Sequence, residues 1–287
     1  MFRPVFTIFA QQYLKALLSD YGNVYLNEPI PRDPKLRIFK HPSRFNWGTE
    51  YLSKITAGSE RVMISPEVIA EAELVDVLFE PEEEKSRTSL GLLGELVSIP
   101  CIIETLRWTP NQRNLRTCLG HWLTWTVEAD GGIIPVDENP VYTEEENDQL
   151  DDDEENDQLD DDEENDQLDD VNKKLLIITP SITPERLQGF GARKTDLNIP
   201  GVYELAPAFY TTIVVTSELQ QDASTLWLRI LGRGSTQRTA IMELQELDVE
   251  HPHRAVVRQQ LQQWYQLLSH GQMGKESKRL MQTLATC

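Results

Sequence analysis

Apolar residues along this chain recur in compact runs and at helical spacing, a combination typical of a sheet covered by helices. Leu74 to Phe79 and Cys101 to Leu106 are compact apolar runs rich in β-branched side chains, and they predict buried strands. Three later segments also predict strands: Lys174 to Thr179, Gly201 to Leu205 and Thr211 to Glu218. The expected fold class is therefore α/β, with a mostly parallel or mixed sheet flanked by helices.

Helices are predicted before, between and after these strands. Apolar residues from Ala10 to Leu18 lie at helical spacing and indicate an amphipathic first helix. A longer helix is expected after Thr109, because Thr109 is a suitable N-cap, Pro110 suits the first helical position and Gln112 completes a capping box. Further helices are expected at Leu90 to Val97, after Thr183, at Ser235 to Leu247 and at Arg254 to Ser269, whereas Thr225 to Leu231 fits a helix or a strand.

One internal repeat interrupts this pattern. The acidic nonapeptide EENDQLDDD begins at Glu145, at Glu154 and, without its last Asp, at Glu163. Each copy offers one apolar residue and cannot build a core, so a disordered insert is expected, the alternative being weak binding of divalent cations or of a basic partner. The expected organisation is two halves of one core at 1–143 and 171–270, a loop excursion near 28–60, the insert at 144–170 and a flexible tail at 271–287.

The repeats also dominate the charge of the 287-residue chain. The formal net charge is −20, but 18 of the 47 acidic residues lie between Glu144 and Asp170. The remaining 260 residues carry 29 acidic and 27 basic side chains, a net charge of −2. The acidity of the whole chain therefore does not exclude a nucleic-acid partner.

Targeting signals and cysteine usage point to the cytoplasm. The apolar start, Met1 to Ala10, is short and lacks a cleavage pattern, and no run is long enough to span a membrane. Cys101, Cys118 and Cys287 are odd in number and lack metal-ligand spacing, which fits a reducing compartment. A cytoplasmic protein without membrane association is expected.

Two acidic residues lie inside predicted buried strands. Alternation places Asp76 on one face of its strand with Leu74 and Leu78, opposite Val75, Val77 and Phe79, and it places Glu104 between Ile102 and Leu106. Buried carboxylates in adjacent strands are costly unless they are paired, protonated or bound to a metal such as Mg²⁺. The alternative is solvent exposure at a strand end or pairing with a nearby arginine, for which the candidates are Arg107, Arg113 and Arg116.

Several segments carry a resemblance to a known family: VDVLFEP, LGLLG, IPCIIETLRWTP, LLIITPS and TLWLRILGRGSTQRTAIMEL. The pattern resembles a family of cyanobacterial proteins that is similar to the restriction-endonuclease-like, PD-(D/E)XK superfamily and lies near the Rpn recombination-promoting nucleases. The likeness covers about residues 5–25 and 65–270, and its most specific part is LWLRILGRG with the helix after it.

The resemblance implies an α/β core in which an Asp of the second strand and a Glu of the third hold Mg²⁺ for hydrolysis of DNA phosphodiester bonds. By position these residues are Asp76 and Glu104. A Lys two residues after the Glu usually positions the attacking water, but that position is Leu106 here. Arg107 follows and could contact a phosphate, although it falls on the opposite strand face and a guanidinium rarely serves as a base.

Two functions are therefore left open. The first is a Mg²⁺-dependent endonuclease that uses Asp76, Glu104 and Arg107 on DNA. The second is a catalytically inactive nuclease-like module that binds or regulates a protein or nucleic-acid partner, and Leu106 at the Lys position favours it. The absence of acidic residues from Thr105 to Val127 gives mild support to a phosphate-bearing partner.

Other candidate sites are weaker. Gly232-Arg233-Gly234 before a helix lacks the Lys-Ser/Thr of a phosphate-binding loop. His121 lies beside Trp122 in an apolar helix face, where packing is the simpler interpretation. Serines such as Ser89 lack the sequence context and the base of a hydrolase.

Overall fold

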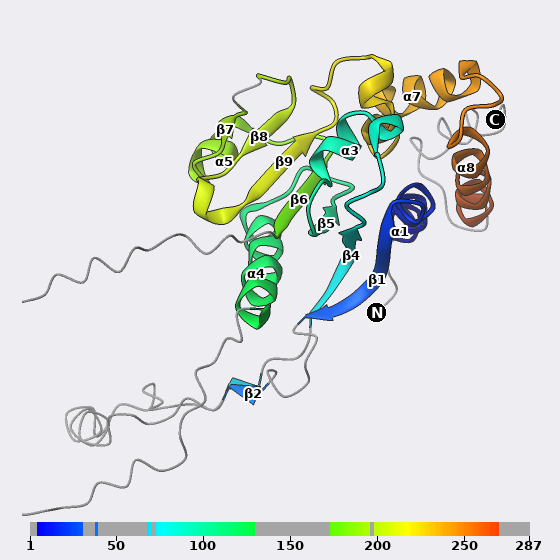
Figure 1. Cartoon of the computed structure of the whole chain (residues 1–287). Coiled ribbons are helices and arrows are strands. Elements are labelled where there is room, and N and C mark those ends of the chain that lie inside the picture. The colour runs from blue at the N-terminus through cyan, green and yellow to red at the C-terminus, as the bar shows by residue number, and fades with distance from the viewer. Residues whose placement is uncertain are drawn as a thin grey trace, which may run out of the picture.

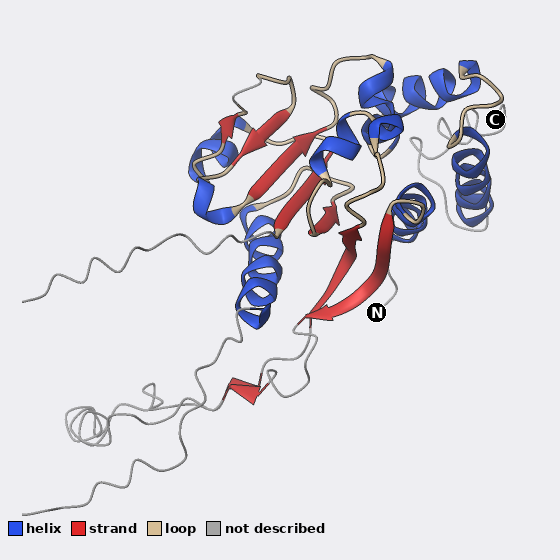
Figure 2. Cartoon of the chain, in the orientation of Figure 1, coloured by secondary structure: helices blue, strands red, loops and turns tan. Residues whose placement is uncertain are grey.

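The computed structural model describes residues 5–30, 38–39, 68–69, 73–129, 173–195 and 198–269. Figures 1 and 2 show a sheet whose strands are covered by helices. The expected insert, the expected tail, Cys287 and most of the expected loop excursion lie outside the described residues.

The sheet has seven strands, and antiparallel strands flank a parallel centre. Its order is β1 (Gly22–Ile30), β4 (Glu73–Pro81), β5 (Cys101–Thr105), β6 (Lys174–Thr179), β9 (Thr211–Val215), β8 (Val202–Glu204) and β7 (Arg193–Lys194). The first three strands form an antiparallel meander, whereas β5, β6 and β9 are parallel to one another. A separate antiparallel pair joins β2 (Ile38–Phe39) to β3 (Val68–Ile69). The predicted α/β class and mixed sheet are confirmed.

The helices are distributed over the whole described chain. They are α1 (Val5–Leu18), α3 (Leu92–Leu96), α4 (Gln112–Ala129), α5 (Pro184–Gly189), α6 (Leu226–Ile230), α7 (Ser235–Glu246) and α8 (Arg254–Ser269), with 3₁₀ turns η2 (Thr88–Leu90), η3 (Pro207–Phe209) and η4 (Ala223–Thr225). None of the described helices is long and apolar enough to cross a membrane.

Each face of the sheet carries its own hydrophobic core. The first core lies between the sheet and helices α1, α3, α6, α7 and α8, and it contains Phe79, Ile103 and Leu176 from the central strands. The second core lies under α4 and α5 and contains Ile102 and Ile177. The alternation of β5 therefore directs Glu104, like Ile102, toward the α4 side.

Strand β1 was not predicted from the sequence. The loop excursion was expected from about residue 28, but Glu28, Pro29 and Ile30 pair with β4. Proline usually argues against a strand because it cannot donate a ladder hydrogen bond, yet it is tolerated at a sheet edge. β1 is an edge strand, which explains why Pro29 fits there.

Helix α4 begins slightly later than its predicted cap. Asn111 and Asn114 satisfy each other, since the Oδ1 atom of each accepts the backbone N–H of the other at 3.0 and 2.9 Å. This reciprocal pair does what a capping box does, with Asn111 in the place predicted for Thr109. The Thr109 hydroxyl instead pairs with the Ser181 hydroxyl.

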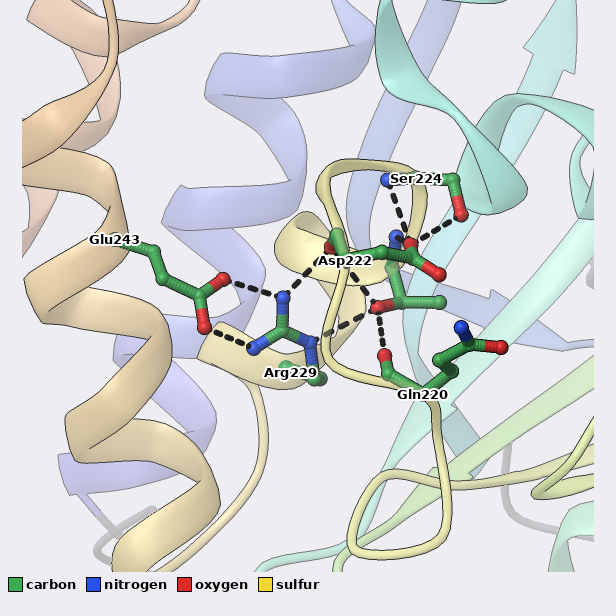
Figure 3. A network of polar contacts seen from close by, with 6 residues as sticks. Gln220, Asp222, Ser224, Arg229 and Glu243 are labelled. Carbon is green, nitrogen blue, oxygen red and sulfur yellow. Dashed lines mark hydrogen bonds and ion pairs between the residues drawn. The ribbon is translucent and has the colours of Figure 1, made fainter.

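The segment Thr225 to Leu231 is helical, and it holds a fully buried arginine (Figure 3). Both terminal nitrogens of Arg229 on α6 bind the carboxylate of Glu243 on α7, with Nη1 2.9 Å from Oε1. Arg229 also donates to the Asp222 carbonyl at 2.7 Å and to the Thr225 hydroxyl at 2.9 Å. The network therefore fixes α6, α7 and the turn before α6 to one another.

Candidate functional site

The buried acid Glu104 is paired with a histidine. Glu104 is 7% exposed, and its Oε1 atom lies 2.8 Å from Nδ1 of His121 on α4. The pairing follows from the fold, because β5 directs Glu104 toward α4 and His121 lies on the inward side of that helix. The sequence offered Arg107, Arg113 and Arg116 as possible partners of Glu104, and of these Arg113 and Arg116 are exposed.

His121 lies between two carboxylates. Its Nε2 is 2.6 Å from Oε2 of Glu73, the first residue of β4. Burial lowers the pKa of His121, but the hydrogen bonds and charges of Glu104 and Glu73 outweigh burial and raise the pKa above its ordinary value. The protonated imidazole can donate one N–H to each acid, so Glu73, His121 and Glu104 form a continuous hydrogen-bonded chain.

The environment of Glu104 favours sharing of that proton. Burial raises the pKa of the Glu104 carboxyl, and the charge of Asp76 raises it further, while the hydrogen bond from His121 lowers it. The pKa values of both partners are thus raised, and one proton between them satisfies both groups. This arrangement stabilises a buried acid without a metal ion.

Asp76 occupies a break in the sheet. The β4–β5 ladder runs from Phe79 to Val77, and the β1–β4 ladder skips the position where Asn27, at φ 57°, faces Asp76. At this break the Asp76 Oδ2 atom accepts hydrogen bonds from the Thr105 backbone N–H at 3.1 Å and from the Thr105 hydroxyl at 3.0 Å. Gln11 of α1 donates to Oδ1 at 3.3 Å. The carboxylate therefore takes the place of ladder hydrogen bonds.

The break also corrects the predicted alternation of β4. Val77 and Phe79 contact the first core as expected, but Val75 lies with Leu78 in the second core. Leu74, which was expected beside Leu78, is 50% exposed. The alternation fails because the strand is irregular at Asp76, and one irregular residue reverses the faces beyond it.

A Mg²⁺ ion at these side chains would have to share or displace the hydrogen-bond donors that they already have. Mg²⁺ needs oxygen ligands in near-octahedral geometry, usually with several retained waters. Two donors from Thr105 occupy Asp76 Oδ2, and the His121 ring, whose raised pKa favours its cationic form, occupies Glu104 Oε1. Within the described parts of the chain, no group of three His, Cys, Asp or Glu residues is arranged to hold a metal ion.

Arg107 lies against the first core. Its Nη1 donates to the Gly232 carbonyl at 2.8 Å and to Gln237 Oε1 at 3.2 Å. Its guanidinium carbon lies 4.7 Å from the centre of the Phe6 ring and 5.8 Å from that of Trp264. These contacts join the end of β5 to α1, α7 and α8, on the sheet side opposite His121, as the strand alternation predicted.

An exposed aromatic side chain follows β5 at the same end of the strand as Arg107. Trp108 follows β5 directly and is 61% exposed. The guanidinium carbon of Arg233, in the Gly232-Arg233-Gly234 turn before α7, lies 3.8 Å from the centre of its ring. Arg113 and Arg116 of α4 are exposed a few residues further on. Sequence reasoning missed Trp108, although its position after a buried strand was visible.

Ser89 lies beside a histidine, His253, but that ring is buried and already bonded to a second hydroxyl, that of Tyr21. Nε2 of His253 is 3.1 Å from Ser89 Oγ and 3.0 Å from the Tyr21 hydroxyl. Burial, reinforced by the charge of His251, lowers the pKa of His253, which is 2% exposed. The cluster connects the start of α8 to η2 and to the turn before β1, and a buried ring cannot reach a substrate.

The Glu73–His121–Glu104 chain predicts a specific pH dependence. A histidine whose pKa is raised on folding contributes stability that is fully present below its unfolded pKa of 6.5 and is lost as pH rises through the folded pKa. Denaturant unfolding from about pH 6 to about pH 9 should show this loss in the natural chain and a smaller one in His121→Gln. Equal pH profiles for the two proteins would contradict the pairing.

Comparison of the chain with protein-family models, with curated proteins and with solved structures found no match.

Proposed function

We propose that this chain is a restriction-endonuclease-like module that binds nucleic acid without cleaving it. One observation carries the proposal: both acids that the resemblance assigns to Mg²⁺ are already engaged by protein donors. Glu104 pairs with His121 and Asp76 with Thr105 and Gln11. Leu106 at the position of the usual Lys agrees with a lost catalytic role.

The order of elements supports the nuclease-like part of the proposal. α1 precedes the meander β1–β4–β5, and α4 then crosses to the parallel strand β6. Asp76 therefore lies in the second strand of this unit and Glu104 in the third, as the resemblance implies.

The end of β5 supports a nucleic-acid partner. A base can stack on the exposed Trp108, whose ring already contacts the guanidinium of Arg233. Exposed arginines at Arg113 and Arg116 supply positive charge for phosphates, and no acidic residue lies between Thr105 and Val127. Exposed bases are most accessible in a single strand, so single-stranded nucleic acid is the proposed partner.

A second candidate is Mg²⁺-dependent hydrolysis of DNA through Asp76 and Glu104, with Arg107 on the phosphate. The observation in its favour is that the two carboxyls are close enough for the charge of Asp76 to raise the pKa of Glu104. In this function the cation shares the two carboxylates with His121 and Thr105 or displaces these donors.

Fluorescence anisotropy with a labelled single-stranded oligonucleotide tests the binding proposal. Trp108→Ala is expected to weaken binding about tenfold, because stacking of one base on an aromatic ring contributes about 1–3 kcal/mol. The matched control is Phe209→Ala, since Phe209 is also exposed, at 39%, but precedes β9 at the other end of the parallel strands.

Two results separate the candidates. Equal affinities for the natural chain and Trp108→Ala would contradict the proposed binding surface and direct the search toward a protein partner. Nicking of plasmid DNA that requires Mg²⁺ or Mn²⁺ and disappears in Glu104→Gln would support the nuclease instead.

A further inference from the structure

A cavity of about 310 Å³ lies at the end of the sheet opposite Trp108. It is lined by Lys174, the first residue of β6, by Thr211 and Thr212 at the start of β9, and by Glu204 at the end of β8. Because β5, β6 and β9 are parallel, their first residues lie at the opposite end of the sheet from Trp108, which follows β5. No part of the proposed nucleic-acid surface or of the acidic pair lines this cavity.

Lys174 brings a positive charge to this cavity without an anionic partner at contact distance. Among the described residues, no side chain makes an ion pair or hydrogen bond with its amine. The nearby Cys101 does not neutralise it, because burial raises the pKa of that thiol to about 12. Burial lowers the pKa of the Lys174 amine, which shows that the ammonium has lost part of its hydration. A half-buried cation in a cavity gains from an anionic ligand.

Glu204 brings the opposite charge to the same cavity. Its carboxylate is close enough to Lys174 to act on the pKa of the amine, yet the two groups do not form an ion pair in the described chain. The rest of the lining is mainly apolar and includes Ile99, Leu205 and Pro207. The cavity thus offers one cation, one separated anion and an apolar wall.

We propose that this cavity binds a small zwitterion with an apolar side chain, of the α-amino acid type. The ligand carboxylate contacts the Lys174 ammonium, the ligand ammonium contacts the Glu204 carboxylate, and the side chain packs against Ile99, Leu205 and Pro207. The volume lies at the lower end of small-molecule sites, about 300–1,000 Å³, which suits a single amino acid.

Ligands with one charge match this cavity less well. An apolar carboxylate would gain the contact with Lys174 but would be repelled by Glu204. An apolar amine would gain the contact with the Glu204 carboxylate but would be repelled by the Lys174 ammonium. Only a ligand with both charges satisfies both groups, so the contrast between these three ligand types is the signature of the site.

Titration calorimetry on the full chain tests this with three probes of similar shape: phenylalanine, 3-phenylpropionate and 2-phenylethylamine. Phenylalanine is expected to bind saturably, and each single-charge probe about tenfold or more weakly, since a hydrogen bond to a charged group is worth about 1.5–3 kcal/mol. Lys174→Met and Glu204→Gln should each weaken phenylalanine binding about tenfold, and Glu204→Gln should leave 3-phenylpropionate binding unchanged or tighter.

The controls remove an equivalent charge elsewhere. Lys194→Met and Glu83→Gln change exposed residues outside the cavity and should leave phenylalanine binding unchanged. Absence of saturable phenylalanine binding to the natural chain would overturn the proposal. So would equal affinity for phenylalanine and 3-phenylpropionate, or unchanged binding in Glu204→Gln, whose exposed position makes it a variant that folds normally. The test is independent of nucleic-acid binding at Trp108.

Discussion

Replacing Glu243 by glutamine is expected to lower the free energy of unfolding by about 3 kcal/mol, because it removes the negative charge of the side chain that is hydrogen-bonded to a buried guanidinium. Arg229 has no exposed surface and cannot lose its proton. The Asp222 carbonyl and the Thr225 hydroxyl would remain as neutral acceptors (Figure 3). Denaturant unfolding measures the effect as a lower midpoint at an unchanged slope.

Replacing the arginine of this pair should destabilise the protein less than replacing Glu243. Arg229→Met leaves Glu243, whose side chain is 30% exposed and can be hydrated, so the expected loss is smaller than for Glu243→Gln. The double variant Arg229→Met, Glu243→Gln should lose less than the sum of the two single changes, since no buried charge is left unpaired. Arg193→Met, at an exposed arginine of β7, is the control and should change stability by less than about 0.5 kcal/mol. Additive losses would contradict the proposed coupling.

Glu104→Gln is expected to destabilise the protein by about 2 kcal/mol, because the hydrogen bond from His121 in this buried site loses its charged acceptor. The sign of this effect is informative. If Asp76 and Glu104 formed an empty cation site, repulsion between the two carboxylates would destabilise the folded state. Neutralising one acid would then raise the free energy of unfolding. Unfolding in the presence of EDTA separates the two cases.

The control for this variant is Glu95→Gln, at an exposed position of α3. His121→Gln should cost about as much as Glu104→Gln, and the double variant should cost little more than either, because both single changes break the same contact. Greater stability of Glu104→Gln than of the natural chain would contradict a structural role for the acid.

Much of the fold could be predicted because period and composition agreed along each segment. The central strands β5, β6 and β9 are continuous apolar runs, and their prediction needed no tertiary information. Strand β1 was not predicted because Pro29 and the polar residues near it are typical of a loop. Its position at a sheet edge, which permits proline, is visible only once the strand order is known.

The candidate site could be predicted only in part. The sequence predicted that Asp76 and Glu104 lie in neighbouring buried strands, where two carboxylates are costly. In the structure they lie in the paired strands β4 and β5. The sequence did not indicate the partner of Glu104, although Cys118, His121, Trp122 and Trp125 share one face of α4 at helical spacing. The break at Asp76 depends on a left-handed Asn27 and on Gln11 from another helix, and no local pattern contains that information.

The structural role of the acidic pair is tested most directly by asking whether a divalent cation binds the folded chain through Asp76. The measurement is the unfolding free energy of the natural chain and of Asp76→Asn as Mn²⁺ is raised, because a cation that binds only the folded state stabilises it as its concentration increases. Any effect of the acidic repeats is common to both proteins and cancels in the comparison. The natural chain and Asp76→Asn are expected to respond equally to Mn²⁺. A stabilisation of the natural chain that is absent in Asp76→Asn would contradict this expectation and establish a metal site at the acidic pair.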